Sequence, residues 1–463
     1  MRHHQGNIRS LLVIAAFGNF GTMSACSNDA LPGTQSDNAE SAEEAQVQQT
    51  TDRVDMSSCA EHLHDDRMES DGLREDAWQL VRWSSPHRSR DTVHVKVLGI
   101  NDFHGQISTG RRVSNRPVGG AAILAAYLAA AQRGLEDRTI LVHAGDHVGA
   151  SPPASALLQD EPSIQFLNLL ANDNCRYEKL SDPECNVVGT LGNHEFDEGR
   201  SELLRLIRGG NHGSGPFLES PWRGARFPYV SSNVVEATSG RPLFPPYVVK
   251  QVGGVRVGFI GVVLKETPRI VTASGIVGLR FLDEAESINR QAKGLTRQGV
   301  HSIVVLIHQG GTQRSYVGPT ATFDAATSGG AAALPSGAIT EIVAKLDASV
   351  DVVVSGHSHQ FTNALIKNRA GSDVLVTQAF SSGTAFGDID LEIERATGKV
   401  VSKMARIVTT WADEGPGLSP DPRVSQVVAQ AERRVAPLVE RVVGFECNRD
   451  HGGPKRCGRV GSW

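Results

Sequence analysis

The chain has 463 residues, of which 40% are hydrophobic and 21% charged, which is the composition of an ordinary globular protein with one large domain or two smaller ones. Its net charge of -5 gives no electrostatic steering toward nucleic acid. An aromatic content of 5% argues against a stacking platform for single-stranded nucleic acid, so no nucleic-acid polymer is expected as a partner.

Residues 1–26 have the pattern of an export signal. Arg2 and Arg9 supply positive charge, and an apolar run over 11–20, too short to span a bilayer, leads through small residues to Cys26. The letters MSAC that end at Cys26 resemble a bacterial lipobox, in which the cysteine is lipidated; plain secretion with cleavage nearby is the alternative. We therefore expect an exported protein, either attached to a membrane through Cys26 as a periplasmic or outer-membrane lipoprotein, or extracellular.

Residues 27–92 are expected to form a disordered tether and a short leader. The stretch from Asn28 to Met56 is rich in Ser, Asp, Glu, Gln and Ala and lacks aromatic residues, which is typical of a disordered segment. Residues 59–90 are polar and mixed, and are expected to fold onto the main domain.

The cysteines fit an oxidising compartment. Cys175 and Cys185 flank the polar stretch CRYEKLSDPEC, which predicts a loop closed by a disulfide. The sequence contains no Cys-x-x-Cys pair, and this excludes a zinc ribbon.

From Val93 onward, apolar runs alternate with helical patterns. Helices are predicted over 119–134, 203–208 and 339–346. Continuous β-branched runs are typical of strands buried on both faces, and their alternation with helices indicates an α/β architecture. The strands predicted in this way lie within 93–100, 139–146, 185–195, 255–263, 301–311 and 350–360.

Three later segments have no helical pattern between them. Residues 373–380, 387–394 and 399–410 are predicted to be short strands in an antiparallel part of a sheet. The Gly-, Ala- and Thr-rich stretch 309–337 is predicted to be a long surface loop beside the site.

Polar side chains follow five of the predicted strands. Because ligands of α/β sheets bind beyond the carboxyl ends of strands, we expect these side chains to meet in one crevice. With His194 set aside, seven side chains exceed what one tetrahedral ion uses and suit two divalent ions that share a carboxylate. Their mixed nitrogen and oxygen atoms permit Zn, Mn, Fe, Co or Mg. The residues are Asp102, His104, Asp146, Asn193, His194, His308, His357 and His359.

Five sequence blocks occur in a fixed order, each at the end of a predicted strand: DFHG, GDHVGASP, GNHEFD, IHQGG and GHSHQ. In this order they resemble the calcineurin-like metallophosphoesterase superfamily, and within it the 5'-nucleotidase family of secreted nucleotidases and UDP-sugar hydrolases. The resemblance covers residues 93–410 and implies a four-layer α/β/β/α sandwich with mixed sheets. No Tyr lies three residues beyond Asp146, which argues against the purple acid phosphatase branch.

The resemblance also implies a role for each residue. A hydroxide bridging two metals would attack phosphorus. His194 would stabilise the developing charge and assist the leaving oxygen, and Asp197 would orient its imidazole and favour the cationic form. The implied ligands are Asp102, His104 and His359 for the first metal, Asn193, His308 and His357 for the second, and Asp146 for both.

Other polar residues near the blocks are expected to have no catalytic role. Glu195 is expected to be structural or solvated, and His143 to be a core histidine with its hydrogen bonds satisfied. His147, beside Asp146, is left out of the site. Arg111 and Arg112 are expected to lie in a solvated loop rather than to contact a substrate phosphate.

Residues 411–463 are expected to comprise a linker helix and a truncated or aberrant tail. Members of the 5'-nucleotidase family carry a second domain that binds the nucleobase between aromatic rings. The stretch 421–444 resembles the helix that leads to it, but the tail after it lacks the Asn- and Gly-rich opening of that domain. Loss of base recognition predicts weak and unselective hydrolysis, because binding energy from remote parts of a substrate contributes to the rate.

The expected function is hydrolysis of nucleoside 5'-monophosphates or related nucleotides by an exported two-metal phosphoesterase. A cyclic-nucleotide phosphodiesterase or a UDP-sugar hydrolase would use the same metal centre. The alternative of another class is an inactive, truncated metal-binding surface protein, which the intact pair of His194 and Asp197 argues against. The acidic balance and the sparse aromatic residues make a nuclease the weaker alternative.

Overall fold

The computed structural model describes residues 91–313, 320–321, 335–440, 444–448 and 456–460. All of these residues belong to one compact unit of the chain. The expected signal, tether and leader therefore lie outside the described residues, apart from the last two positions before Val93. Most of the loop predicted over 309–337 lies outside them as well.

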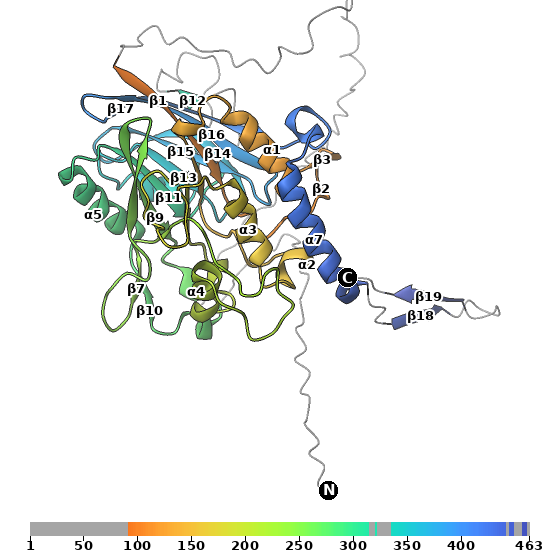
Figure 1. The fold of residues 1–463 in the computed structure, drawn as a ribbon. Coiled ribbons are helices and arrows are strands. Elements are labelled where there is room, and N and C mark those ends of the chain that lie inside the picture. The colour runs from red at the N-terminus through yellow and green to blue at the C-terminus, as the bar shows by residue number, and fades with distance from the viewer. Residues whose placement is uncertain (1–90, 314–319, 322–334, 441–443, 449–455, 461–463) are drawn as a thin grey trace, which may run out of the picture. The chain divides into compact units, whose positions relative to one another are not determined.

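The first of two large sheets has seven described strands in the order β12-β17-β16-β1-β4-β5-β6 (Figure 1). Strands β1, β4, β5 and β6 run parallel, whereas β16, β17 and β12 follow beside β1 in antiparallel pairs. The bounds are β12 Thr320–Ala321, β17 Val400–Thr409, β16 Ala385–Glu394, β1 Thr92–Ile100, β4 Thr139–His143, β5 Val187–Thr190 and β6 Tyr229–Val230.

The second large sheet has six described strands in the order β14-β15-β13-β11-β9-β8. The four central strands run parallel, and the two edge strands pair with them antiparallel. The bounds are β14 Phe361–Lys367, β15 Asp373–Ala379, β13 Val352–Ser355, β11 Ser302–His308, β9 Val255–Val263 and β8 Tyr247–Val252.

The two sheets pack face to face and helices cover both outer faces, which confirms the four-layer α/β/β/α architecture. One core lies between the sheets and joins Val97 of β1 to Val304 of β11. A second core packs the first sheet against helices that include α1, α3, α4 and α7, and a third packs the second sheet against α5 and α6. Figure 1 shows α5 on one side of the strands and α1, α3 and α7 on the other. The helices are α1 Ala121–Ala131, α2 Pro153–Ala156, α3 Glu161–Leu170, α4 Arg200–Arg208, α5 Glu284–Arg297, α6 Ala338–Val343 and α7 Pro422–Val439.

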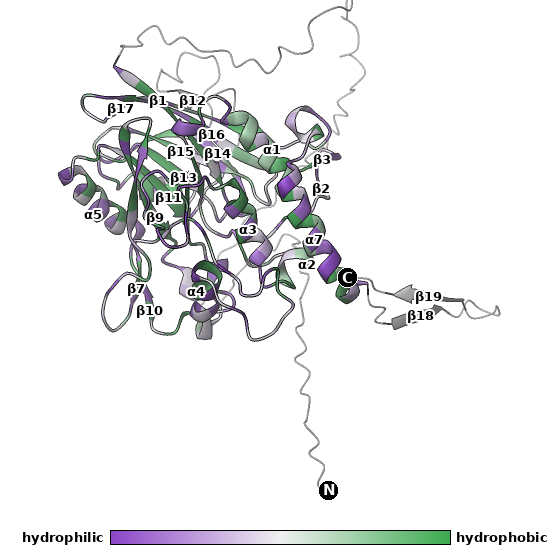
Figure 2. Cartoon of the chain, in the orientation of Figure 1, coloured by the Kyte–Doolittle hydropathy of each residue, from purple (hydrophilic) through white to green (hydrophobic). Residues whose placement is uncertain are grey.

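Hydropathy follows these layers. Figure 2 shows the central strands green, whereas α4, α5 and α7 carry purple residues as well as green ones. Helix α7 buries Val424, Ala431 and Val435 in the core of the first sheet, so the expected linker helix packs on the domain along its length. Of the described helices, none is both long and apolar enough to cross a membrane.

Short elements complete the described chain. Two two-stranded ribbons and five 3-10 helices lie in the connections between the larger elements, and a third ribbon follows α7. Cys175 and Cys185 form the predicted disulfide. The ribbons are β2 Arg111–Val113 with β3 Arg116–Val118, β7 Val234–Glu236 with β10 Leu279–Phe281, and β18 Gly444–Asn448 with β19 Arg456–Val460. The 3-10 helices are η1 Glu136–Arg138, η2 His194–Phe196, η3 Thr267–Arg269, η4 Ala273–Ile276 and η5 Gly415–Leu418.

One prediction about strand pairing needs correction. The antiparallel pairing expected of the three late strands holds for β16 and β17, which lie side by side in the first sheet. Strand β15 instead belongs to the second sheet, where it runs parallel to β13 and antiparallel to β14. A strand buried on both faces has the same apolar pattern in either sheet, so the pattern alone does not assign its partner.

Candidate metal centre

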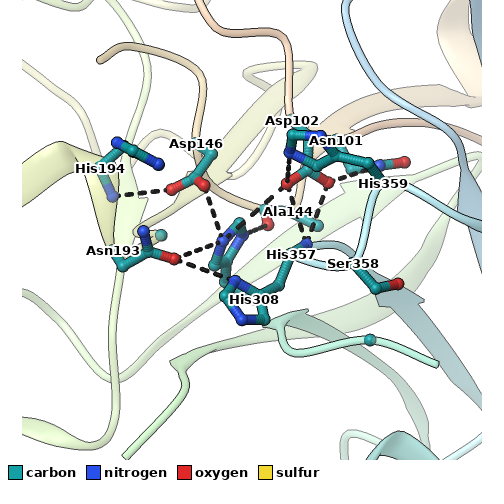
Figure 3. Close-up of polar contacts among 12 residues, drawn as sticks. Asn101, Asp102, Ala144, Asp146, Asn193, His194, His308, His357, Ser358 and His359 are labelled. Atoms are coloured by element: carbon teal, nitrogen blue, oxygen red, sulfur yellow. Dashed lines mark hydrogen bonds and ion pairs between the residues drawn. The ribbon is translucent and has the colours of Figure 1, made fainter. Parts of the chain in front are cut away.

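The five polar strand ends meet at one edge of the sandwich. Strands β1, β4 and β5 come from the first sheet, and β11 and β13 from the second. Because strands within each group run parallel, their carboxyl ends lie at the same edge, and the two sheets bring these edges together. Figure 3 shows side chains from both sheets pointing toward one another at this place.

The backbone at the site is strained at several of the predicted ligands. Five of the seven have positive φ angles, in the left-handed region that residues other than glycine rarely adopt. Such conformations persist where the surrounding structure enforces them, and they cluster at functional sites. The φ angles are 49° for Asp102, 49° for His104, 46° for Asp146, 74° for His357 and 55° for His359.

Gly192 allows two of the loops to cross. A Cβ atom on this residue would lie 2.1 Å from Oδ1 of Asp146 and 2.4 Å from its backbone nitrogen. No side chain fits at such a distance, so the residue before Asn193 has to be glycine. The glycine that opens the GNHEFD block thus serves the close approach of the backbone to the site.

The first group of potential ligands comprises Asp102, His104, Asp146 and His359. The Nε2 atoms of His104 and His359 lie 3.0 Å apart, and Nε2 of His359 lies 3.3 Å from Oδ1 of Asp102. Oδ2 of Asp146 lies 3.8 Å from Nε2 of His104. The potential ligand atoms of the group all lie within 4.8 Å of one another.

The second group comprises Asp146, His308 and His357, with Asn193 between the two imidazoles (Figure 3). Nε2 of His308 lies 3.0 Å from Oδ2 of Asp146. Oδ1 of Asn193 lies 3.1 Å from Nε2 of His308 and 3.1 Å from Nδ1 of His357. Asp146 is thus common to both groups.

Hydrogen bonds from Nδ1 orient the rings of His104 and His308 so that Nε2 faces the site. Nδ1 of His104 lies 2.9 Å from the carbonyl oxygen of Gly149, and Nδ1 of His308 lies 2.8 Å from that of Ala144. A carbonyl oxygen only accepts hydrogen bonds, so each Nδ1 carries the proton and donates. In the neutral ring the Nε2 lone pair then points into the site, which is the arrangement seen in histidines that bind metal ions.

The electrostatics of the site favour positive charge between buried carboxylates. Burial lowers the pKa of His104 and of His357, which keeps both rings neutral and able to bind a cation. Burial would lower the pKa of His308 too, but the carboxylate of Asp146 outweighs this effect and raises the pKa to about 10. A histidine that holds a proton so firmly marks a place where a metal cation would be stabilised.

His194 and Asp197 form a pair at the mouth of the site. Nδ1 of His194 lies 2.6 Å from Oδ2 of Asp197, and the two side chains are 33% and 35% exposed. Burial lowers the pKa of His194, but the hydrogen bond to Asp197 and the charge of Asp146 raise it to about 9. Its ring packs edge-on against His104, with 5.0 Å between the centroids. The pair is therefore next to the first group and open to solvent.

Glu195 positions the loops that carry the predicted ligands, a role that the sequence did not specify. Its carboxylate accepts hydrogen bonds from the backbone N–H groups of Asp146 and His147, both at 2.9 Å, and of Gly192 at 2.5 Å. The side chain is 5% exposed. The structural alternative expected for Glu195 is correct and the solvated one is wrong.

Asn101 is a second positioning residue that sequence reasoning missed. Its Nδ2 donates to Oδ2 of Asp102 and to the carbonyl oxygen of Phe380, both at 2.6 Å. Its Oδ1 accepts from the backbone nitrogen of Ala379 at 2.9 Å. It thereby fastens the first ligand strand to the end of β15. The only available signal was its place directly before Asp102 in the motif.

The remaining polar residues named in the sequence analysis are not members of either group of potential ligands. His143 is buried as expected, and neither of its ring nitrogens has a hydrogen-bond partner among the described residues. His147 is also buried, and its Nε2 donates to the carbonyl oxygen of Ser163 at 2.8 Å. Arg111 and Arg112 are exposed in the ribbon of β2 and β3, as expected.

Comparison with known proteins agrees with this geometry. The family model for calcineurin-like phosphoesterase matches residues 95–361. The endonuclease YhcR of Bacillus subtilis is 33% identical over 373 residues, which cover 78% of this chain and 27% of that protein. The cell wall protein Lmo0130 of Listeria monocytogenes is 36% identical over 376 residues, which cover 78% of this chain and 44% of that protein. A solved structure, that of a 5'-nucleotidase precursor from Thermus thermophilus, matches with a TM-score of 0.56 and 25% identity, covering 76% of this chain and 61% of that one.

The chain spans less than half the length of these two curated relatives. The family match nevertheless covers more than half of the 463 residues and contains all seven predicted ligands. The resemblance drawn from the five sequence blocks is thereby confirmed. The chain belongs to the calcineurin-like phosphoesterase family.

Proposed function

We propose that this chain is an exported phosphoesterase that holds two divalent metal ions and hydrolyses nucleoside 5'-monophosphates or related nucleotides. The observation that carries the proposal is the convergence of two ligand groups on one shared carboxylate, Asp146, beside the solvent-exposed His194.

The donor set suits two ions from among Zn, Mn, Fe, Co and Mg, because it mixes oriented imidazoles with carboxylate and amide oxygens. When bound, such a pair supplies Lewis-acid activation of water and stabilises charge on the reacting oxygens. One ion would be held by Asp102, His104 and His359, the other by Asn193, His308 and His357, and both by Asp146.

His194 is the residue that we assign to the substrate. Asp197 occupies its Nδ1 atom, so Nε2 is the nitrogen that remains for a phosphoryl or leaving-group oxygen. With a pKa of about 9 the ring is a cation at neutral pH and can donate a proton to the departing oxygen. Glu195 and Asn101 hold the loops in register and do not contact the reacting atoms.

Nucleotides are the favoured substrates because the Thermus thermophilus protein is described as a 5'-nucleotidase precursor and shares this fold at 25% identity. A second candidate is the cleavage of phosphodiester bonds in a polynucleotide. It is favoured by the 33% identity to a protein named an endonuclease, despite the net charge of -5. Cyclic nucleotides and UDP-sugars are further esters that the same group of side chains could process.

Export is supported by three observations. The first 26 residues have the pattern of a signal, Cys175 and Cys185 form a disulfide, and one relative is named a cell wall protein. Disulfides persist in oxidising compartments outside the cytosol. Lipid attachment through Cys26 belongs to the same proposal, and a mass shift of the membrane-extracted protein would test it.

The test is hydrolysis by the purified full chain loaded with Mn²⁺ or Zn²⁺. AMP, a 2',3'-cyclic nucleotide, UDP-glucose and single-stranded DNA are compared as substrates, and bound metal is measured by emission spectroscopy. We expect about two ions per chain and release of phosphate from AMP. His194→Ala is expected to lower turnover about 10²- to 10⁴-fold, the range for loss of a general acid.

The matched control is His212→Ala, which removes a histidine from a surface loop and should leave turnover unchanged. Equal turnover in both variants would contradict the role given to His194. Cleavage of DNA in preference to AMP would replace the first substrate class by the second.

A further inference from the structure

We propose that Phe380 is an aromatic platform against which the base of the substrate stacks while its phosphate occupies the metal centre. This inference rests on the proposed function and specifies how the leaving group is recognised. Phe380 is 42% exposed, and within residues 91–313 and 335–440 it is the one exposed aromatic residue. Every other Phe, Tyr or Trp within these two ranges is buried or half-buried.

The position of Phe380 follows from the sheet. It is the first residue after β15, which runs parallel to β13, the strand that leads to His357 and His359. Parallel strands end at the same edge, so Phe380 lies at the edge that carries the ligands.

Two hydrogen bonds fix Phe380 to the segments that carry the ligands. Its N–H donates to the carbonyl oxygen of Gln360 at 3.1 Å, directly after His359. Its carbonyl oxygen accepts from Nδ2 of Asn101 at 2.6 Å, and the same amide donates to Asp102. The backbone of Phe380 is therefore tied on both sides to the first ligand group.

The backbone conformation of Phe380 is a second, independent observation. Its φ angle is 52°, in the left-handed region, which is unfavourable for a bulky residue. Backbone strain of this kind clusters at ligand-binding positions, where the surrounding hydrogen bonds enforce it.

Phe361 extends the apolar surface. It opens β14, two residues after His359, and its ring centroid lies 5.9 Å from that of Phe380 with 37° between the planes. One ring supports the other and leaves Phe380 accessible. A purine or pyrimidine has flat π faces that stack on such a ring without regard to the identity of the base.

The experiment compares two phosphate monoesters that differ only in the base. The metal-loaded full chain hydrolyses AMP or ribose 5-phosphate, and kcat and KM are measured for the wild type and for Phe380→Ala, Phe380→Leu and Phe380→Trp. Leu418→Ala, which shortens an exposed apolar residue 67% accessible in η5, is the matched control.

We expect Phe380→Ala to raise KM for AMP about tenfold with little change in kcat, because stacking is made equally before and during the reaction. Ribose 5-phosphate should keep its kcat/KM within about twofold. Phe380→Trp should retain selectivity for AMP, and Phe380→Leu should lose it although it remains apolar. The control should resemble the wild type.

A ratio of the two kcat/KM values that stays the same in Phe380→Ala would overturn the platform, and so would full selectivity in Phe380→Leu. Turnover of both esters would persist in that case, so the phosphoesterase activity itself would stand. Calorimetric titration of the metal-loaded chain with AMP gives a readout without turnover: affinity should fall about tenfold in Phe380→Ala, and an unchanged affinity would likewise overturn the inference.

Discussion

Glu195 gathers three backbone N–H groups from two loops around one buried carboxylate. Replacing it by glutamine keeps the size but offers one acceptor oxygen and an amide that cannot accept. We expect Glu195→Gln to lower the free energy of unfolding by about 1–3 kcal/mol, the cost of a buried donor without a partner, and to weaken metal retention. Urea unfolding and metal content after dialysis measure the two effects.

The control for this variant is Glu198→Gln, because Glu198 is exposed on the same segment. It should match the wild type in both measurements. Metal retention that is equal in the two variants would show that Glu195 does not position the ligands.

Asp197 sets the pH range in which His194 carries its proton. The pKa of His194 is raised to about 9, so activity that needs the cation should fall as the pH rises through that region. In Asp197→Asn the side-chain charge is lost, the pKa moves back toward its ordinary value of 6.5, and the alkaline limb of the kcat/KM profile should shift to lower pH by at least about one unit. An unshifted alkaline limb would mean that another group controls it.

At the scale of elements, strand β8 carries a lysine into the interior. Nζ of Lys250 is buried and donates to the carbonyl oxygen of Asp182, within the loop that the disulfide closes. Burial lowers the pKa of Lys250 from 10.5 to about 8. Between these values the unfolded chain binds more protons than the folded one, so stability rises with pH across this interval.

Lys250→Met should remove this dependence. In the wild type, the burial of Lys250 should make the free energy of unfolding rise by about 1–3 kcal/mol between about pH 8 and pH 10.5. The variant should not show this rise. Urea denaturation at several pH values measures it, with Lys293→Met on the exposed side of α5 as the control. If the free energy of unfolding depends on pH in the same way in both variants, Lys250 is in contact with water and its pKa is not lowered by burial.

At the scale of the whole molecule, the candidate metal centre joins the two sheets. Ligands that bind only the folded chain stabilise it by mass action, about 2.7 kcal/mol at a hundredfold excess over the dissociation constant. We expect the melting temperature to be higher in Mn²⁺ than in a chelator, and Asp146→Asn, which alters the shared carboxylate, to abolish most of the difference. A melting temperature that does not respond to metal in the wild type would contradict a centre that bridges the sheets.

Much of this molecule could be predicted from its residues. Continuous apolar runs located the parallel strands, and the polar residues at their ends named the side chains that the fold brings together. The pairing of β15 could not be predicted, because an apolar strand fits either sheet. The hydrogen bonds of Glu195, Asn101 and Phe380 join residues that are far apart in the sequence. A local sequence pattern does not predict such contacts.

The separation of the site residues along the chain also has a consequence for synthesis. Asp102 and His357 are 255 positions apart in the sequence, and the backbone N–H of His357 donates a hydrogen bond to the carboxylate of Asp102. Contacts between such distant positions form late in folding, because the chain between them has to be ordered first. A growing polypeptide emerging from the ribosome therefore holds no complete centre until residue 359 has been added and the two halves have docked. The proposed hydrolysis therefore requires the whole domain.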